Sequence, residues 1–133
     1  DIVGLTGYNT GNYYPGETWR EFPVIYDLLV RSYASVFSHP FMITEFGSNS
    51  VGGDKKAWID NMFTAIKKYP RIKAAIWWSG TDWDSQNQPA RIYRIDENNQ
   101  VLDAFARGLT EYRQDSVAAG AQGGKEDDVS YRG

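Results

Sequence analysis

The chain has 133 residues, enough for one domain with a hydrophobic core but only about half of the roughly 250 residues typical of an eight-stranded α/β barrel. Its net charge is -3 with both signs scattered along the sequence, which argues against a nucleic-acid partner, and it has no basic amphipathic helix or long apolar run that would indicate a membrane. It has no cysteine, so disulfides are excluded. Small molecules or neutral polymers are therefore the expected partners.

The first predicted unit is a strand followed by a helix. Residues 2–8 form an apolar run that Asn9 closes, and a loop with Tyr13, Tyr14 and a Pro-Gly turn follows. From Trp19 to about Phe37 apolar residues recur at helical spacing, which predicts a helix. Because the chain opens inside a predicted strand, we expect it to be a fragment of a longer protein.

The second predicted strand carries the most informative residue of the chain. An apolar run from Phe41 to Phe46, bounded by Pro40 and Gly47, is typical of a strand buried in a parallel sheet. Glu45 interrupts this run at its carboxyl end. A carboxylate there needs a partner, and catalytic residues of parallel α/β folds gather at this end of the strands.

Two further helices and a third strand complete the pattern. Asp54 is a plausible N-cap for a helix that reaches Ile66, and residues 72–78 read as a third buried strand. A polar loop follows, and then a short extended piece over residues 91–95. The last helix is expected to start near Asn98 or Asn99. Three strand–helix units in succession predict an α/β fold with a parallel sheet.

The composition changes near the end of the chain. Residues 114–133 are rich in Gly, Ala, Ser and charged residues with almost no apolar anchor, which predicts a flexible tail or linker. The folded part is accordingly expected over residues 1–113.

The loops after the three strands hold the candidate site residues. Glu45 is the only good candidate nucleophile, whereas the single His39 lies at the opposite end of its strand. Asp82 and Asp84 resemble half of a calcium loop, but the Gly and the distant Glu of that pattern are missing, so a solvated loop without metal is expected.

Three short segments resemble a known family. Gly7-Tyr8-Asn9, Ile43-Thr44-Glu45-Phe46-Gly47 and Ile76-Trp77-Trp78 resemble, in this order, the C-terminal part of glycoside hydrolase family 26, the β-mannanases and mixed-linkage β-glucanases. The resemblance covers about Asp1 to Tyr112. It implies that the chain contains strands six to eight of a (β/α)8 TIM barrel.

The resemblance also implies roles for individual residues. Glu45 would be the nucleophile of a retaining hydrolase, Tyr8 would orient it, and Trp77 would support the sugar beside the scissile bond. Strand parity agrees with Trp77 rather than Trp78 facing inward, because the small Ala75 lies two positions earlier. The other expected substrate-binding residues are Asn9, Tyr13, Tyr14, Asp82 and Trp83. No cofactor is implied.

The family uses a second Glu, the general acid/base, from a strand that has no counterpart in this chain. The resemblance therefore implies a fragment of an extracellular endo-β-glycanase that acts on β-linked polysaccharide, with little activity of its own. Two alternatives are a non-catalytic carbohydrate-binding module and a self-associating fragment. Open sheet edges predict a homo-oligomer or pairing with a missing N-terminal half.

Overall fold

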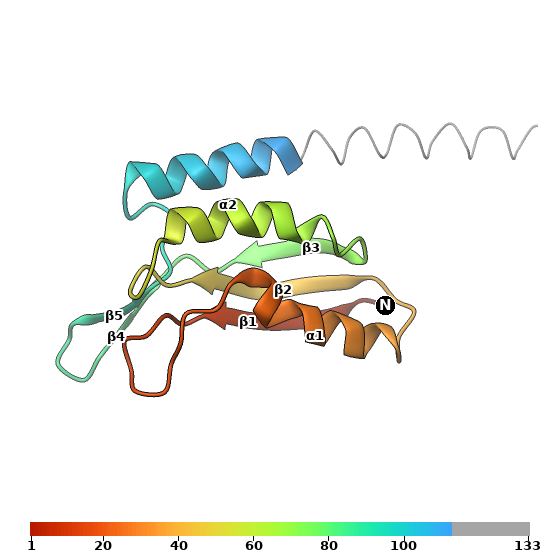
Figure 1. Ribbon diagram of the computed structural model, residues 1–133, viewed down its shortest axis with the longest axis horizontal. Helices are drawn as coiled ribbons and strands as arrows, with labels where there is room; N and C mark the ends of the chain where they lie inside the picture. The colour runs from red at the N-terminus through yellow and green to blue at the C-terminus, as the bar shows by residue number, and fades with distance from the viewer. Residues whose placement is uncertain (113–133) are drawn as a thin grey trace, which may run out of the picture.

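The computed structural model describes residues 1–112, so the predicted tail over residues 114–133 lies outside the described part. Three parallel strands form a sheet in the order β1 (Val3–Asn9), β2 (Phe41–Ser48) and β3 (Ile72–Trp77) (Figure 1). Helix α1 (Phe22–Ala34) follows β1, α2 (Lys55–Ile66) follows β2, and residues 99–112 are helical. The prediction of consecutive strand–helix units around a parallel sheet is confirmed.

The helix ends follow from local capping chemistry. The Asp54 carboxylate accepts a hydrogen bond from the Ala57 N–H at 3.1 Å, which confirms the predicted N-cap of α2. Asn98 accepts in the same way from the Val101 N–H at 2.9 Å and begins the last helix. Helix α1 is shorter than predicted at both ends, because Glu21 is extended and the helix stops before Ser35.

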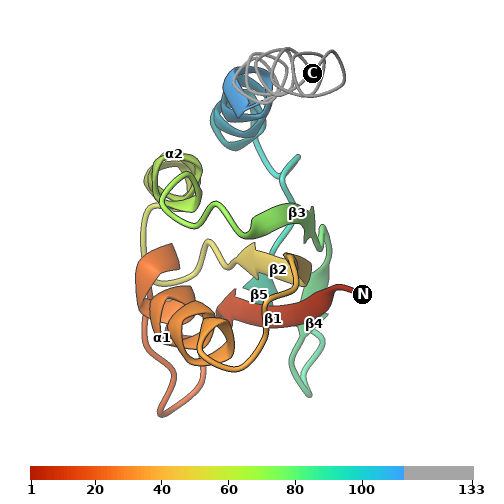
Figure 2. The same cartoon turned by 90° about the vertical axis from the view of Figure 1, so that its right-hand side faces the viewer.

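Helices α1 and α2 cover one face of the sheet (Figure 2). The aromatic and aliphatic side chains between them form the core, and burying each large side chain contributes about 1.5–3 kcal/mol to folding. The largest buried members are Trp58, Tyr26, Phe22, Phe41, Ile43, Ile59 and Met62. None of the helices within residues 1–112 is long and apolar enough to cross a bilayer.

The opposite face of the sheet is uncovered in the described part of the chain. Thr6, Thr44 and Ala74 are exposed on it, and Ile76 is 51% exposed. Strands β1 and β3 are the edges of this described sheet. Parallel sheets are usually covered on both faces, so this surface is suited to contact with further polypeptide or ligand.

A hairpin lies beyond the carboxyl end of the sheet, at the same end of the molecule as the loop between β1 and α1 (Figure 1). Strands β4 (Thr81–Trp83) and β5 (Pro89–Ile92) pair in antiparallel fashion. The sequence predicted only a polar loop and an extended piece over residues 91–95. The turn forms because the Asp84 carboxylate accepts hydrogen bonds from two N–H groups, of Gln86 and Gln88, while Asn87 has a positive φ of 60°.

Candidate active site

A β-bulge in β2 decides which way Glu45 points. Ile43 and Phe46 are both buried in the core, although they are three residues apart and strict alternation would place them on opposite faces. The pairing with β1 and with β3 shifts register between them, so β2 carries one extra residue. Thr44 and Glu45 are therefore both exposed, and the carboxylate reaches the uncovered face rather than the helices.

Tyr8 is the direct partner of this carboxylate. Its hydroxyl donates a hydrogen bond to Oε1 of Glu45 across neighbouring parallel strands, as the predicted pairing of the two residues requires. Burial, followed by the hydrogen bond and the negative charge of Glu45, raises the pKa of Tyr8 well above the ordinary value. The phenol therefore remains a hydrogen-bond donor to the carboxylate well into the alkaline range.

An open cleft of about 370 Å³ surrounds this pair. The volume lies within the roughly 300–1,000 Å³ of typical small-molecule sites. Its lining residues are Tyr8, Thr10, Glu45, Trp78, Asp82, Arg91 and Tyr93. Residues at the carboxyl ends of the strands and residues of the hairpin therefore line the cleft together.

Sequence reasoning missed Tyr93 as a residue of this cleft. Its ring centroid lies 4.9 Å from that of Tyr8 and 5.6 Å from that of Trp78, so it packs against both rings. Tyr93 is only 3% exposed and follows β5 directly. Its position depends on the hairpin, and the sequence predicted only an extended segment over residues 91–95 in this region.

The predicted orientation of the tandem tryptophans is wrong. Trp77 packs towards the helices, with ring centroids 5.9 Å from Trp58 and 5.6 Å from Phe105, and its indole N–H donates to the Tyr93 carbonyl. Trp78 lines the cleft and is 38% exposed. Ala75 and Trp77 do share one face of β3, as their spacing requires, but that face is turned towards the helices, whereas Ala74, Ile76 and Trp78 are exposed on the other.

Asn9 does not face the cleft either, contrary to its prediction as a substrate-binding residue. It is fully buried, its amide donates to the Ser48 hydroxyl at 2.9 Å, and its side-chain oxygen accepts from the Arg20 N–H at 2.8 Å. A buried polar side chain with both ends satisfied holds its surroundings in place. Asn9 therefore fixes the strand ends and the start of α1 instead of binding a ligand.

The remaining predicted residues occupy different positions around the cleft. Asp82 lines it directly. The Tyr13 hydroxyl donates to Asp84, which ties the loop after β1 to the hairpin, and the Tyr14 ring lies 4.8 Å from the Arg91 guanidinium. Trp83 is 57% exposed on β4 outside the cleft lining. Of these four side chains, only that of Asp82 is in the cleft.

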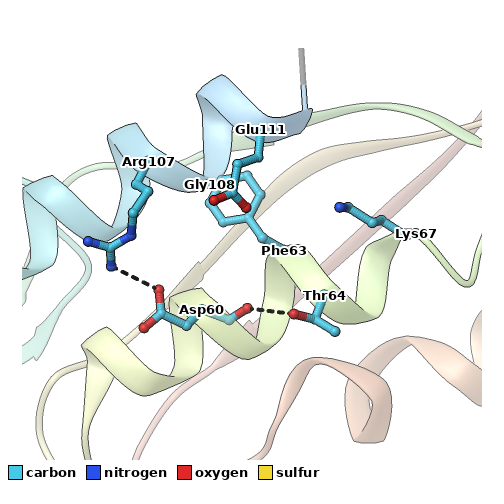
Figure 3. Close-up of a pocket in the computed structure, with 7 residues that line it drawn as sticks. All are labelled: Asp60, Phe63, Thr64, Lys67, Arg107, Gly108 and Glu111. Carbon is cyan, nitrogen blue, oxygen red and sulfur yellow. Dashed lines mark hydrogen bonds and ion pairs between the residues drawn. The ribbon is translucent and has the colours of Figure 1, made fainter. Parts of the chain in front are cut away.

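A second cavity of about 270 Å³ lies between α2 and the last helix (Figure 3). Its charged groups are partly paired, since Arg107 contacts Asp60 at 3.5 Å, and the Phe63 ring packs against Gly108. The other lining residues are Thr64, Lys67 and Glu111. This cavity shares no lining residue with the cleft around Tyr8 and Glu45, and it is a groove between two packed helices.

His39 is distant from the cleft, as expected. It precedes β2 in an exposed position, and its carbonyl accepts a hydrogen bond from Arg71. Within the described residues, no group of three or more His, Cys, Asp or Glu side chains is arranged to hold a metal ion.

The chain is similar to part of an endoglucanase. Over 97 residues, 69% of its length, it is 31% identical to Endoglucanase H of Acetivibrio thermocellus. The match spans only 11% of that much longer protein. No family model matches the chain. The similarity is to a short part of an endoglucanase.

Proposed function

We propose that this chain is the nucleophile-bearing part of a retaining endo-β-glycanase of the family 26 type, with β-mannan or β-glucan as its substrate. The observation that carries the proposal is the hydrogen bond from Tyr8 to Glu45 at the carboxyl ends of adjacent parallel strands. Trp78 adds a partly exposed aromatic face to the same cleft. The partial similarity to an endoglucanase supports this reading.

The proposed chemistry assigns one step to each of these side chains. Glu45 attacks the anomeric carbon, the bond to the leaving oxygen breaks, and a covalent glycosyl ester forms that water later hydrolyses. Tyr8 holds the attacking carboxylate in orientation. The Trp78 ring packs against the apolar face of a sugar, because aromatic rings combine a large apolar surface with little conformational freedom.

A retaining enzyme also needs a proton donor on a second carboxyl group about 5–5.5 Å from the nucleophile. Asp82 shares the cleft with Glu45, but its carboxylate is ion-paired with Arg91 at 3.3 Å. We propose that the acid/base is supplied by polypeptide that has no counterpart in this sequence. Because general acid catalysis contributes roughly 10²–10⁴-fold, the chain alone should hydrolyse polysaccharides very slowly.

Covalent trapping tests this proposal without requiring the acid. A 2-deoxy-2-fluoro-β-cellobiosyl or β-mannobiosyl fluoride carries a leaving group that departs without protonation, and the fluorine at C2 slows hydrolysis of the ester. Mass spectrometry should find one glycosyl group on the peptide that contains Glu45, and none on the Glu45→Gln variant. Labelling at another residue, or none where an intact retaining glycanase is labelled, would contradict the assignment.

A non-catalytic carbohydrate-binding role is the second candidate. The exposed faces of Trp78 and Trp83 favour it, since both rings are available for stacking on sugars. Calorimetric titration with cello- and manno-oligosaccharides separates the two functions. Binding that is unchanged in the Glu45→Gln variant, together with failed trapping, supports the binding module.

The uncovered sheet face also implies an association partner. We propose that the free edges of β1 and β3 pair with the polypeptide that supplies the acid/base or, in its absence, with a second copy of the chain. Light scattering of the purified chain should then give a mass above that of the monomer. A monomer at all concentrations would contradict the self-association.

A further inference from the structure

The cleft contains an ion pair that the proposed hydrolytic step does not use. Asp82 on β4 and Arg91 on β5 are cross-strand partners in the hairpin, and Nη1 of Arg91 lies 3.3 Å from Oδ2 of Asp82. Both side chains line the same cleft as Glu45 and Trp78. The pair therefore offers a fixed donor and a fixed acceptor beside the candidate nucleophile.

Besides Asp82, two other residues hold the Arg91 guanidinium in place. Its Nε and Nη2 both donate to Oε1 of Glu17, which belongs to the loop between β1 and α1. Its guanidinium also lies 4.8 Å from the centre of the Tyr14 ring, within range of a cation–π interaction. These contacts fix the plane of the guanidinium, so little side-chain freedom is lost when it binds a ligand.

Exposure shows which part of this network is open to a ligand. The Glu17 side chain is 15% exposed, that of Arg91 is 27% exposed, and that of Asp82 is 43% exposed. Glu17 is thus the most shielded of the three side chains, whereas Asp82 and Arg91 line the cleft.

We propose that Asp82 and Arg91 form a subsite that binds two adjacent hydroxyl groups of a neutral sugar, next to the sugar that lies over Glu45. A hydroxyl group both donates and accepts, so one hydroxyl donates to the Asp82 carboxylate while its neighbour accepts from Arg91. This subsite rests on the proposed glycanase function and names a substrate feature for it.

The charges of the cleft select against acidic sugars. Glu45 and Asp82 both line the cleft, where Arg91 is the one cation among the lining residues, and Arg91 is already paired with Asp82 and Glu17. A uronic acid would bring a further negative charge among them without a free cation, and like charges at this range repel. The subsite therefore favours neutral glucose or mannose units.

The test compares Asp82→Ala with a matched control, Asp103→Ala, which removes an exposed carboxylate from the last helix. Binding of cellotetraose, mannotetraose and the corresponding disaccharides is measured by calorimetry. Because hydrogen bonds to charged groups are strong, Asp82→Ala should weaken tetrasaccharide binding roughly ten- to a hundredfold, and Asp103→Ala should not change it. Arg91→Lys, which keeps the charge but loses the planar donor set, should also weaken binding.

One feature of the expected binding data would not be seen if Asp82 and Arg91 only stabilised the fold. In the wild type the disaccharide, which fills the subsite as well as the position over Glu45, should bind more tightly than glucose or mannose alone in the same titrations, and Asp82→Ala should remove most of that difference while leaving monosaccharide binding nearly unchanged. If Asp82→Ala preserves the difference while Trp78→Ala still abolishes binding, the subsite is refuted and the proposed function stands. If the wild type binds none of these sugars, both are refuted.

Discussion

Replacing Lys55 by Met removes a buried cation that holds the hairpin segment against α2. The Lys55 side chain is 1% exposed, and its ammonium donates to the carbonyls of Ile92 at 3.0 Å and Arg94 at 2.6 Å. It also forms an ion pair with Glu97 at 3.2 Å. Burial lowers the pKa of Lys55 despite the opposing effect of Glu97, which shows how strongly the ammonium is desolvated.

The expected cost follows from the groups that lose the ammonium. Methionine keeps most of the apolar stem, so the loss is electrostatic: the Glu97 carboxylate, only 16% exposed, loses its cation and keeps the Ser50 hydroxyl, and the Ile92 and Arg94 carbonyls lose the ammonium, although Ile92 keeps the Ser50 N–H. Breaking a buried pair by removing one partner costs about 3–5 kcal/mol. At about 4 °C per kcal/mol, the unfolding midpoint of Lys55→Met should fall by roughly 12–20 °C.

Lys56 provides a matched control in the next position. It forms an exposed i,i+4 pair with Asp60, of the kind worth about 0.3–0.5 kcal/mol, so Lys56→Met should change the midpoint by no more than roughly 2 °C. Thermal and urea unfolding followed by circular dichroism measure both variants. A second change, Glu97→Gln, should recover part of the Lys55→Met loss. Stability of Lys55→Met within about 1 kcal/mol of the wild type would refute the reasoning.

Two further predictions concern packing and pH. A Cβ at Gly108 would lie 2.1 Å from the Phe63 ring, so Gly108→Ala should lower the free energy of unfolding, measured in urea, by about 1–3 kcal/mol. A decrease within about 0.5 kcal/mol of that caused by the exposed control Thr110→Ala would contradict this. Burial raises the pKa of Tyr26 and raises that of Tyr93 to about 12, so both contribute stability that is complete below pH ~10. That stability should be lost as the pH rises from ~10 towards 12, by up to about 1.4 kcal/mol per pH unit for each tyrosine, and a flat urea midpoint between pH 9 and 11.5 would contradict this.

That Tyr8 and Glu45 lie near each other could be predicted from strand ends at the same edge of a parallel sheet, whereas the hydrogen bond between them was implied by the family resemblance. The tandem tryptophans could not be oriented in the same way. Period two correctly puts Ala75 and Trp77 on one face, but the pattern alone does not say whether that face meets the helices or the uncovered side. Asn9 was misjudged for a related reason, because a polar residue at a strand end suits a ligand or a buried hydrogen-bond network equally well.

The sequence by itself determined the order of the three parallel strands and of the helices, since apolar periodicity and capping residues such as Asp54 act locally. The tertiary structure alone decided where the site's side chains point. The bulge that exposes Glu45 forms because the core takes up both Ile43 and Phe46, and the hairpin brings Arg91 across to Glu17, 74 residues away in the chain. Such contacts depend on the packing of distant segments, which local sequence patterns do not encode.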